Sequence, residues 1–161
     1  VRNPKEDLVK VAVVERHQGT GNVACGFLKG YGIKEGAVAL SVAHDSHNII
    51  VVGVNDEEME FAVNSLIAQE GGIVLVKEGK VIEQMPMPIA GLMSDQSGEW
   101  VDEKLTSIHE KAYTELGICG DVEPVMTLCF MSLAVIPEIK LTDMGLFDVT
   151  TFSFIPVEIS R

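Results

Sequence analysis

The chain consists of short apolar runs separated by polar or glycine-rich segments. Runs rich in β-branched residues are typical of buried strands and predict them at 8–14, 37–43 and 49–54. Residues 73–77 and 80–84 flank Glu78 and Gly79 and predict a hairpin, because glycine readily adopts the positive φ of a tight turn. Residues 26–32 (GFLKGYG) suit either a short helix or a turn.

Two longer segments have the apolar spacing of amphipathic helices. The first covers about 56–69, with Asn55 placed to cap its N-terminus, and glycines follow its end. The second covers about 98–116, with Ser97 as its cap and Gly117 after its last turn. A third, short helix is expected within 86–93, a segment that begins with prolines.

These elements predict one domain of the α/β or α+β class, a sandwich in which helices pack on a mixed β-sheet. A length of 161 residues with 47% hydrophobic residues fits a single core. The longest apolar stretch, 125–136, is shorter than the roughly 20 residues of a membrane span and contains Thr127 and Ser132. It therefore predicts a buried element.

Charge and cysteine content narrow the class of protein. A net charge of −12 argues against nucleic acid or an anionic membrane as a partner, because phosphate binding requires clusters of Lys and Arg. The three cysteines form no C-x-x-C pair, so reduced thiols in a cytoplasmic protein are expected. Residues 1–8 (VRNPKEDL) show neither a signal-peptide pattern nor an initiator Met, and we expect a piece of a longer chain.

A polar break between two predicted strands contains the strongest catalytic candidates, His44, Asp45 and His47. If this segment is a loop at a strand end, its histidines can converge while the carboxylate orients one imidazole, an arrangement suited to proton transfer or base recognition. A polar turn that satisfies local backbone groups is the equally open alternative. No metal site is predicted in this chain, because zinc usually needs at least three protein ligands.

A second candidate segment, 15–22 (ERHQGTGN), follows the first predicted strand. Loops at strand ends often carry function, and the candidate substrate-binding residues are Glu15, His17, Asn22 and Asn48. A surface turn is the favoured interpretation of 15–22. Elsewhere, His109 is expected to face solvent and Asp143 to serve turn chemistry.

Several motifs together resemble a known family. They are ERHQGTGN (15–22), GFLKGYGI (26–33), SVAHDSHNIIVVGVND (41–56), GGIV (71–74), PMPIAGLMS (86–94) and MTLCFMSLAVIPEIKLTDMGLFD (126–148). Over nearly its whole length the chain resembles the C-terminal domain of bacterial adenine deaminases, members of the amidohydrolase superfamily. The whole of 1–161 is interpreted as that domain.

The resemblance implies a longer enzyme with a metal-binding barrel ahead of this domain. Manganese or iron in that barrel would activate water, which converts adenine to hypoxanthine and ammonia in purine salvage. Because the barrel is missing from 1–161, we expect the isolated chain to be inactive and to act as an accessory to the barrel's active site. The implied partners are adenine, the protein's own N-terminal barrel and further copies in a homo-oligomer. A purely structural or oligomerisation domain is the main alternative, and an independent metal-binding module is a weaker one.

Overall fold

The structure is a computed structural model that describes residue 3 and residues 5–158. The assignment of 1–161 to one domain thus includes residues 1–2, 4 and 159–161, which lie outside the described residues. In chain order the elements are β1 (Leu8–Val14), β2 (Val23–Lys29), β3 (Ala37–Leu40), β4 (Ile49–Gly53), α1 (Asp56–Ala68), β5 (Gly72–Lys77), β6 (Lys80–Pro86), α2 (Gly98–Thr114), α3 (Pro124–Cys129), the 3-10 helix η1 (Phe130–Ser132), β7 (Ile139–Thr142), β8 (Gly145–Asp148) and β9 (Ser153–Ile155).

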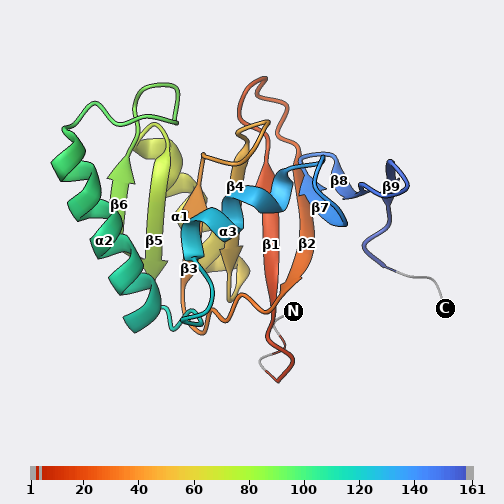
Figure 1. The fold of residues 1–161 in the computed structure, drawn as a ribbon, viewed down its shortest axis with the longest axis horizontal. Coiled ribbons are helices and arrows are strands. Elements are labelled where there is room, and N and C mark those ends of the chain that lie inside the picture. The colour runs from red at the N-terminus through yellow and green to blue at the C-terminus, as the bar shows by residue number, and fades with distance from the viewer. Residues whose placement is uncertain (1–2, 4, 159–161) are drawn as a thin grey trace.

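Two antiparallel sheets form the framework (Figure 1). The larger has the order β2-β1-β4-β3-β5-β6, and the smaller has the order β7-β8-β9. The predicted α+β class is confirmed, whereas the larger sheet is antiparallel rather than mixed. The β5–β6 hairpin turns at Glu78 and Gly79, as predicted, and both residues have positive φ.

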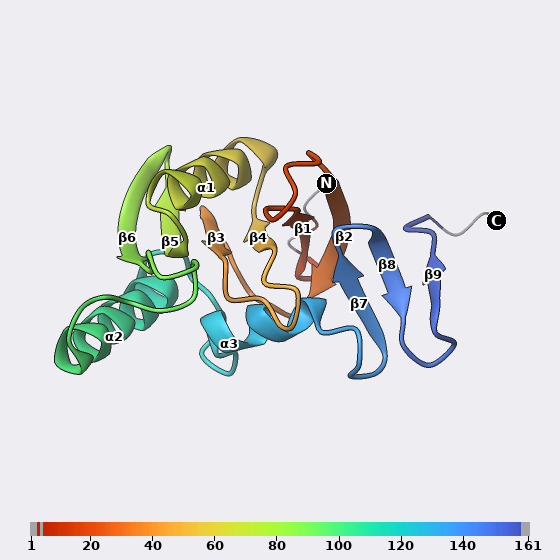
Figure 2. The same cartoon turned by 90° about the horizontal axis from the view of Figure 1, so that it is seen from above.

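Helices cover both faces of the larger sheet (Figure 2). On one face, Met59, Ala62 and Leu66 of α1 pack on small and β-branched strand residues. On the other face, α2 and α3 cover a larger cluster that includes Leu40, Ile50 and Leu75. This coverage explains why β3 and β4 are buried throughout and read as continuous apolar runs. The predicted caps Asn55 and Ser97 accept hydrogen bonds from the first turns of α1 and α2.

Two segments differ from their prediction. Residues 26–32 do not form a helix, because Val23–Lys29 is strand β2, which pairs with β1 at the sheet edge. Gly26 lies on the side of β2 that faces the small sheet, where a Cβ would contact Leu146 at 3.4 Å, an ordinary packing distance. Residues 86–93 form turns with an Ile89–Met93 bridge instead of a helix, because Ala90 and Gly91 have positive φ.

The segment after α2 also departs from expectation. The stretch 125–136 contains most of α3 and all of η1, but Met126 and Val135 remain exposed, so it is only partly buried.

His109 of α2 does not simply face solvent, because its Nδ1 lies 2.7 Å from the Leu105 carbonyl oxygen and its Nε2 contacts the Glu123 carboxylate. Among the described residues, no helix has the length and apolar character needed to cross a bilayer.

Candidate functional site

The candidate site lies at the end of the larger sheet where β1, β3 and β6 finish. The loops that follow these strands are 15–22, 41–48 and 87–97, and all three emerge at the upper end of the sheet in Figure 1. The sequence separates these loops widely. Antiparallel pairing brings them to one edge, because alternate strands run in the same direction.

The 41–48 loop begins with a buried serine that ends β3 earlier than the predicted 37–43. Ser41 Oγ donates to the Gly91 carbonyl oxygen at 2.5 Å and accepts from the Gly72 backbone N–H at 2.8 Å. Its hydroxyl thus joins the loops after β3 and β6 to the start of β5. The chain then turns through 44–48 before β4 begins.

His44 anchors the 44–48 turn to the helical segment on the other side. Its backbone N–H donates to the Cys129 carbonyl oxygen at 3.0 Å, and its own carbonyl accepts from Ser132 Oγ at 3.1 Å. The imidazole lies 4.9 Å from the Phe130 ring, measured between centroids. His44 is half-buried, while Asp45 next to it is exposed.

His47 has an unusual environment for a histidine. Its Nδ1 is buried, and no hydrogen-bond partner for that atom is found among the described residues. Burial lowers the pKa of His47, and the neighbouring His44 and Arg16 lower it further, against an opposing effect of Asp45. The imidazole is therefore favoured in its neutral form near pH 7, in which one ring nitrogen accepts hydrogen bonds.

The 15–22 loop is organised around one carboxylate. Glu15 accepts from the backbone N–H groups of Thr20 at 3.0 Å and Gln18 at 2.7 Å, and also from that of His17. These bonds lower the pKa of Glu15 from 4.5 to about 2, and the bond from the Thr20 backbone has the largest effect. Glu15 thus acts as an acceptor for its own loop.

The loop and the turn meet directly. His17 Nε2 lies 2.6 Å from the Ser46 carbonyl oxygen, and Arg16 Nε donates to the His47 carbonyl oxygen at 2.5 Å. Asn48 is buried, with 3% of its surface exposed, and its Oδ1 accepts from the Arg16 backbone N–H at 3.3 Å. Two segments that the sequence singled out separately thus form one continuous surface.

All four candidate substrate-binding residues line one cavity of about 320 Å³. It is completed by Gln18, Thr20, Asp143 and Met144, the last two from the turn between β7 and β8. Most of its lining residues carry an amide, carboxylate, imidazole or hydroxyl group, although carbon atoms form most of the lining surface. Such a lining suits a small ligand with apolar faces and hydrogen-bonding edges. His44, Asp45 and His47 do not line this cavity.

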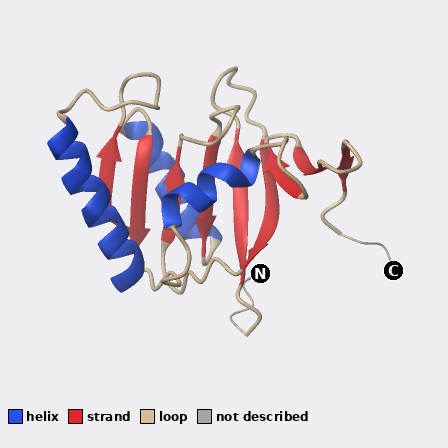
Figure 3. Ribbon diagram, viewed as in Figure 1, coloured by secondary structure: helices blue, strands red, loops and turns tan. Residues whose placement is uncertain are grey.

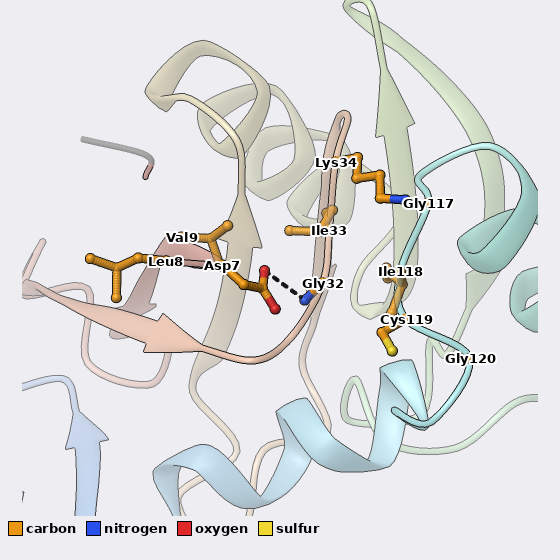
Figure 4. A pocket seen from close by; sticks show the side chains of 10 residues that line it. All are labelled: Asp7, Leu8, Val9, Gly32, Ile33, Lys34, Gly117, Ile118, Cys119 and Gly120. Carbon is orange, nitrogen blue, oxygen red and sulfur yellow. Dashed lines mark hydrogen bonds between the residues drawn. The ribbon is translucent and has the colours of Figure 1, made fainter. Parts of the chain in front are cut away.

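A larger cavity, of about 660 Å³, lies at the opposite end of the sheet (Figure 4). Its lining comes from the start of β1, the segment before β3 and the segment after α2. Asp7 provides a carboxylate there, but that group accepts from the Gly32 N–H at 3.1 Å. This cavity contains none of the predicted site residues.

No group of three or more His, Cys, Asp or Glu side chains is placed to hold an ion in the part of the chain that the structure describes. The described residues therefore do not fit a divalent metal site, and no chemical step is assigned to a metal held by them.

Two residues at this end of the sheet were not among the predicted site residues. The sequence singles out Arg16 only as a member of the 15–22 segment, yet it contacts both the 44–48 turn and Ala90. Asp143 was assigned to turn chemistry, yet it lines the 320 Å³ cavity. An arginine between the candidates Glu15 and His17 is a signal that the sequence contains, whereas the approach of the β7–β8 turn cannot be read from it.

Comparison with known proteins adds independent information. The family model for the adenine deaminase C-terminal domain matches residues 1–153. Adenine deaminase 2 of Desulfotalea psychrophila is 75% identical over 153 residues, covering 95% of this chain and 27% of that protein. Adenine deaminase of Ligilactobacillus salivarius is 52% identical over 159 residues, covering 99% and 28%. Adenine deaminase of Bacillus subtilis is 48% identical over 152 residues, covering 94% of this chain and 26% of that protein. The chain thus spans little more than a quarter of these relatives' lengths.

Proposed function

The chain belongs to the adenine deaminase C-terminal domain family, and from this premise we propose that it completes the active site of an adenine deaminase. The reaction adds water to adenine and releases hypoxanthine and ammonia, as part of purine salvage in the cytoplasm. The named activity of the relatives supports this proposal. Because the chain spans only part of those relatives, the remaining polypeptide would form the catalytic barrel.

The observation that carries the proposal is the convergence of the 15–22 loop and the 44–48 turn. Antiparallel pairing alone places the two loops at one edge, so the weight rests on the hydrogen bonds between them and on the cavity that the 15–22 loop and Asn48 line beside the turn. The cavity's volume of about 320 Å³ lies within the range of small-molecule sites and can accommodate a purine. Its amide and carboxylate groups match the alternating donors and acceptors of a purine edge.

We assign roles to the residues as follows. Neutral His47 would accept or relay a proton near the substrate, with His44 and Asp45 adjusting its charge from within the same turn. His17, Asn22, Glu15 and Asn48 would form the wall that orients the purine, although Glu15 and Asn48 act partly through the loop bonds they already make. A divalent iron or manganese ion, bound in the barrel, would supply Lewis-acid activation of water.

A structural or oligomerisation role is favoured by a separate observation. The small sheet of β7, β8 and β9 lies at the edge of the molecule, away from α1 and α2 (Figure 3). Phe154 in β9 is 52% exposed, Phe152 in the β8–β9 turn is 77% exposed, and Phe27 of the neighbouring β2 is 48% exposed. Apolar surface of this kind marks contact sites, so the barrel or a second copy would pack here.

Substitutions in the full-length enzyme separate the two roles. We expect His47→Ala and Asp45→Asn to lower kcat/KM for adenine at least about tenfold while changing Tm little, because proton-transfer groups typically contribute about 10²- to 10⁴-fold. Phe152→Ser tests the second role instead, since it alters the exposed apolar surface and leaves the 44–48 turn intact. Normal kcat/KM with a lowered Tm for His47→Ala would instead assign the turn to the scaffold.

A further inference from the structure

Arg16 connects three segments at the candidate site. Besides the bond from Nε to the His47 carbonyl, its Nη2 donates to the Ala90 carbonyl oxygen at 2.9 Å. Its backbone N–H donates a hydrogen bond to Asn48 Oδ1. One residue at the end of β1 therefore holds both the 44–48 turn and the turn after β6.

The guanidinium fits closely against the turn after β6. Gly91 has φ +72°, and a Cβ at this position would lie 3.0 Å from Nη1 and 3.2 Å from Cζ of Arg16. The Gly91 carbonyl is itself held by the Ser41 hydroxyl at 2.5 Å. The position of Gly91, against which the guanidinium packs, is thus fixed by a hydrogen bond that does not involve Arg16.

The charge of Arg16 is not neutralised within the described residues. The ion pairs found there involve Lys10, Lys77, Lys104, Lys111 and His109, and none includes Arg16. Burial lowers the pKa of Arg16, but an arginine remains protonated at any physiological pH. The cation is therefore directed at backbone carbonyls.

We propose that Arg16 is a positioning residue, which fixes the 44–48 turn through the His47 carbonyl and so determines where the His47 imidazole is presented. The planar guanidinium is suited to this, because it donates to two carbonyls at once in a rigid geometry that an ammonium group cannot reproduce. The inference rests on the proposed function, in which neutral His47 acts beside the purine.

The same contact has an electrostatic consequence. The charged or titratable groups around His47 are His44, Asp45, Arg16 and His17, and Arg16 is the one that is positively charged at every working pH. Removing its charge raises the pKa of His47. Because the proposed role needs the neutral imidazole, the acidic limb of the kcat/KM profile then moves to higher pH.

Two variants of the full-length enzyme distinguish geometry from charge. Arg16→Ala is expected to lower kcat/KM for adenine by about 10- to 100-fold, mainly through kcat, because a displaced catalytic group loses rate steeply with distance. Its acidic limb should move to higher pH, and added guanidinium ion should restore part of the rate. Arg16→Lys keeps the charge but not the planar group, so kcat should fall while the acidic limb stays in place.

Lys10→Ala is the matched control, because it removes a cation from β1, the strand that leads to Arg16, and that cation pairs with Asp56 at 2.9 Å. It should change kcat/KM less than about twofold. If His47→Ala lowers kcat/KM but Arg16→Ala and Arg16→Lys do not, the positioning role is wrong and the proposed function stands. If His47→Ala has no effect, the proposed function itself is wrong. A lowered Tm with unchanged kcat would make Arg16 merely structural, and Arg16→Lys decides the matter if Arg16→Ala does not fold.

Discussion

Replacing Glu83 by glutamine tests how α2 is held against β6, the strand that leads into the turn contacted by Arg16. The Glu83 carboxylate accepts from Lys104 Nζ at 2.9 Å and Ser107 Oγ at 2.5 Å, and Lys111 Nζ lies 3.2 Å away. Only 10% of the Glu83 side chain is exposed. A neutral amide in its place keeps the shape but loses the charge-assisted bonds.

The size of the effect follows from the pKa of Glu83. Burial alone would raise it, but the bonds from Ser107, Lys104 and Lys111 outweigh burial and lower the pKa from 4.5 to about 2. That difference corresponds to an upper bound of roughly 3 kcal/mol. Both lysines are about a third exposed, so solvent screens their charge. We therefore expect Glu83→Gln to reduce the free energy of unfolding by about 1–2 kcal/mol at pH 7.

Urea unfolding of the 161-residue chain, followed by circular dichroism at several pH values, measures this effect. Because the folded-state pKa is lowered, the contribution of Glu83 is complete above about pH 4.5 and is lost as pH falls toward 2. The difference between Glu83→Gln and the parent chain should shrink over that interval. Glu103→Gln, at an exposed position on α2, should change the free energy of unfolding by no more than about 0.5 kcal/mol. Equal stability at pH 7, or a pH-independent difference, would refute the reasoning.

Three further expectations follow from the site. Gly91→Ala should lower the free energy of unfolding by about 1–2 kcal/mol, because of its positive φ and the close guanidinium, and calorimetry of the full-length protein checks this. Asp143→Asn should raise KM for adenine about tenfold in steady-state kinetics with unchanged Tm, since its carboxylate lines the cavity. The isolated chain, supplied with manganese or iron, should release no ammonia from adenine above background, because its described residues assemble no three-ligand site; turnover by the pure chain would contradict this.

Most of the framework could be predicted from local patterns. Strands buried on both faces produce continuous apolar runs, as in β3 and β4, and α1 and α2 carry side-chain caps at the predicted serine and asparagine. Strand β2 could not be recognised in this way. It lies at a sheet edge with mostly exposed side chains, and it packs against Leu146 of β8, which comes from far along the chain.

The candidate site was predictable in its residue types but not in its arrangement. The polar breaks at 15–22 and 44–48 are visible because they interrupt apolar strands. Their contact through His17 and Ser46 depends on the antiparallel pairing of β1 with β4, which local pattern does not specify. The same limitation applies to His109, whose partner Glu123 comes from the N-cap of a separate helix.

The most direct test of the account is a crystal structure of the full-length enzyme with adenine or hypoxanthine bound. The central claim is that this domain contributes the 15–22 loop and the 44–48 turn to the purine site. The account predicts that the polar cavity faces the barrel, with the purine within hydrogen-bond distance of His17, Asn22 or His47. A purine enclosed entirely by the barrel, with the 44–48 turn packed elsewhere or facing solvent, would contradict it.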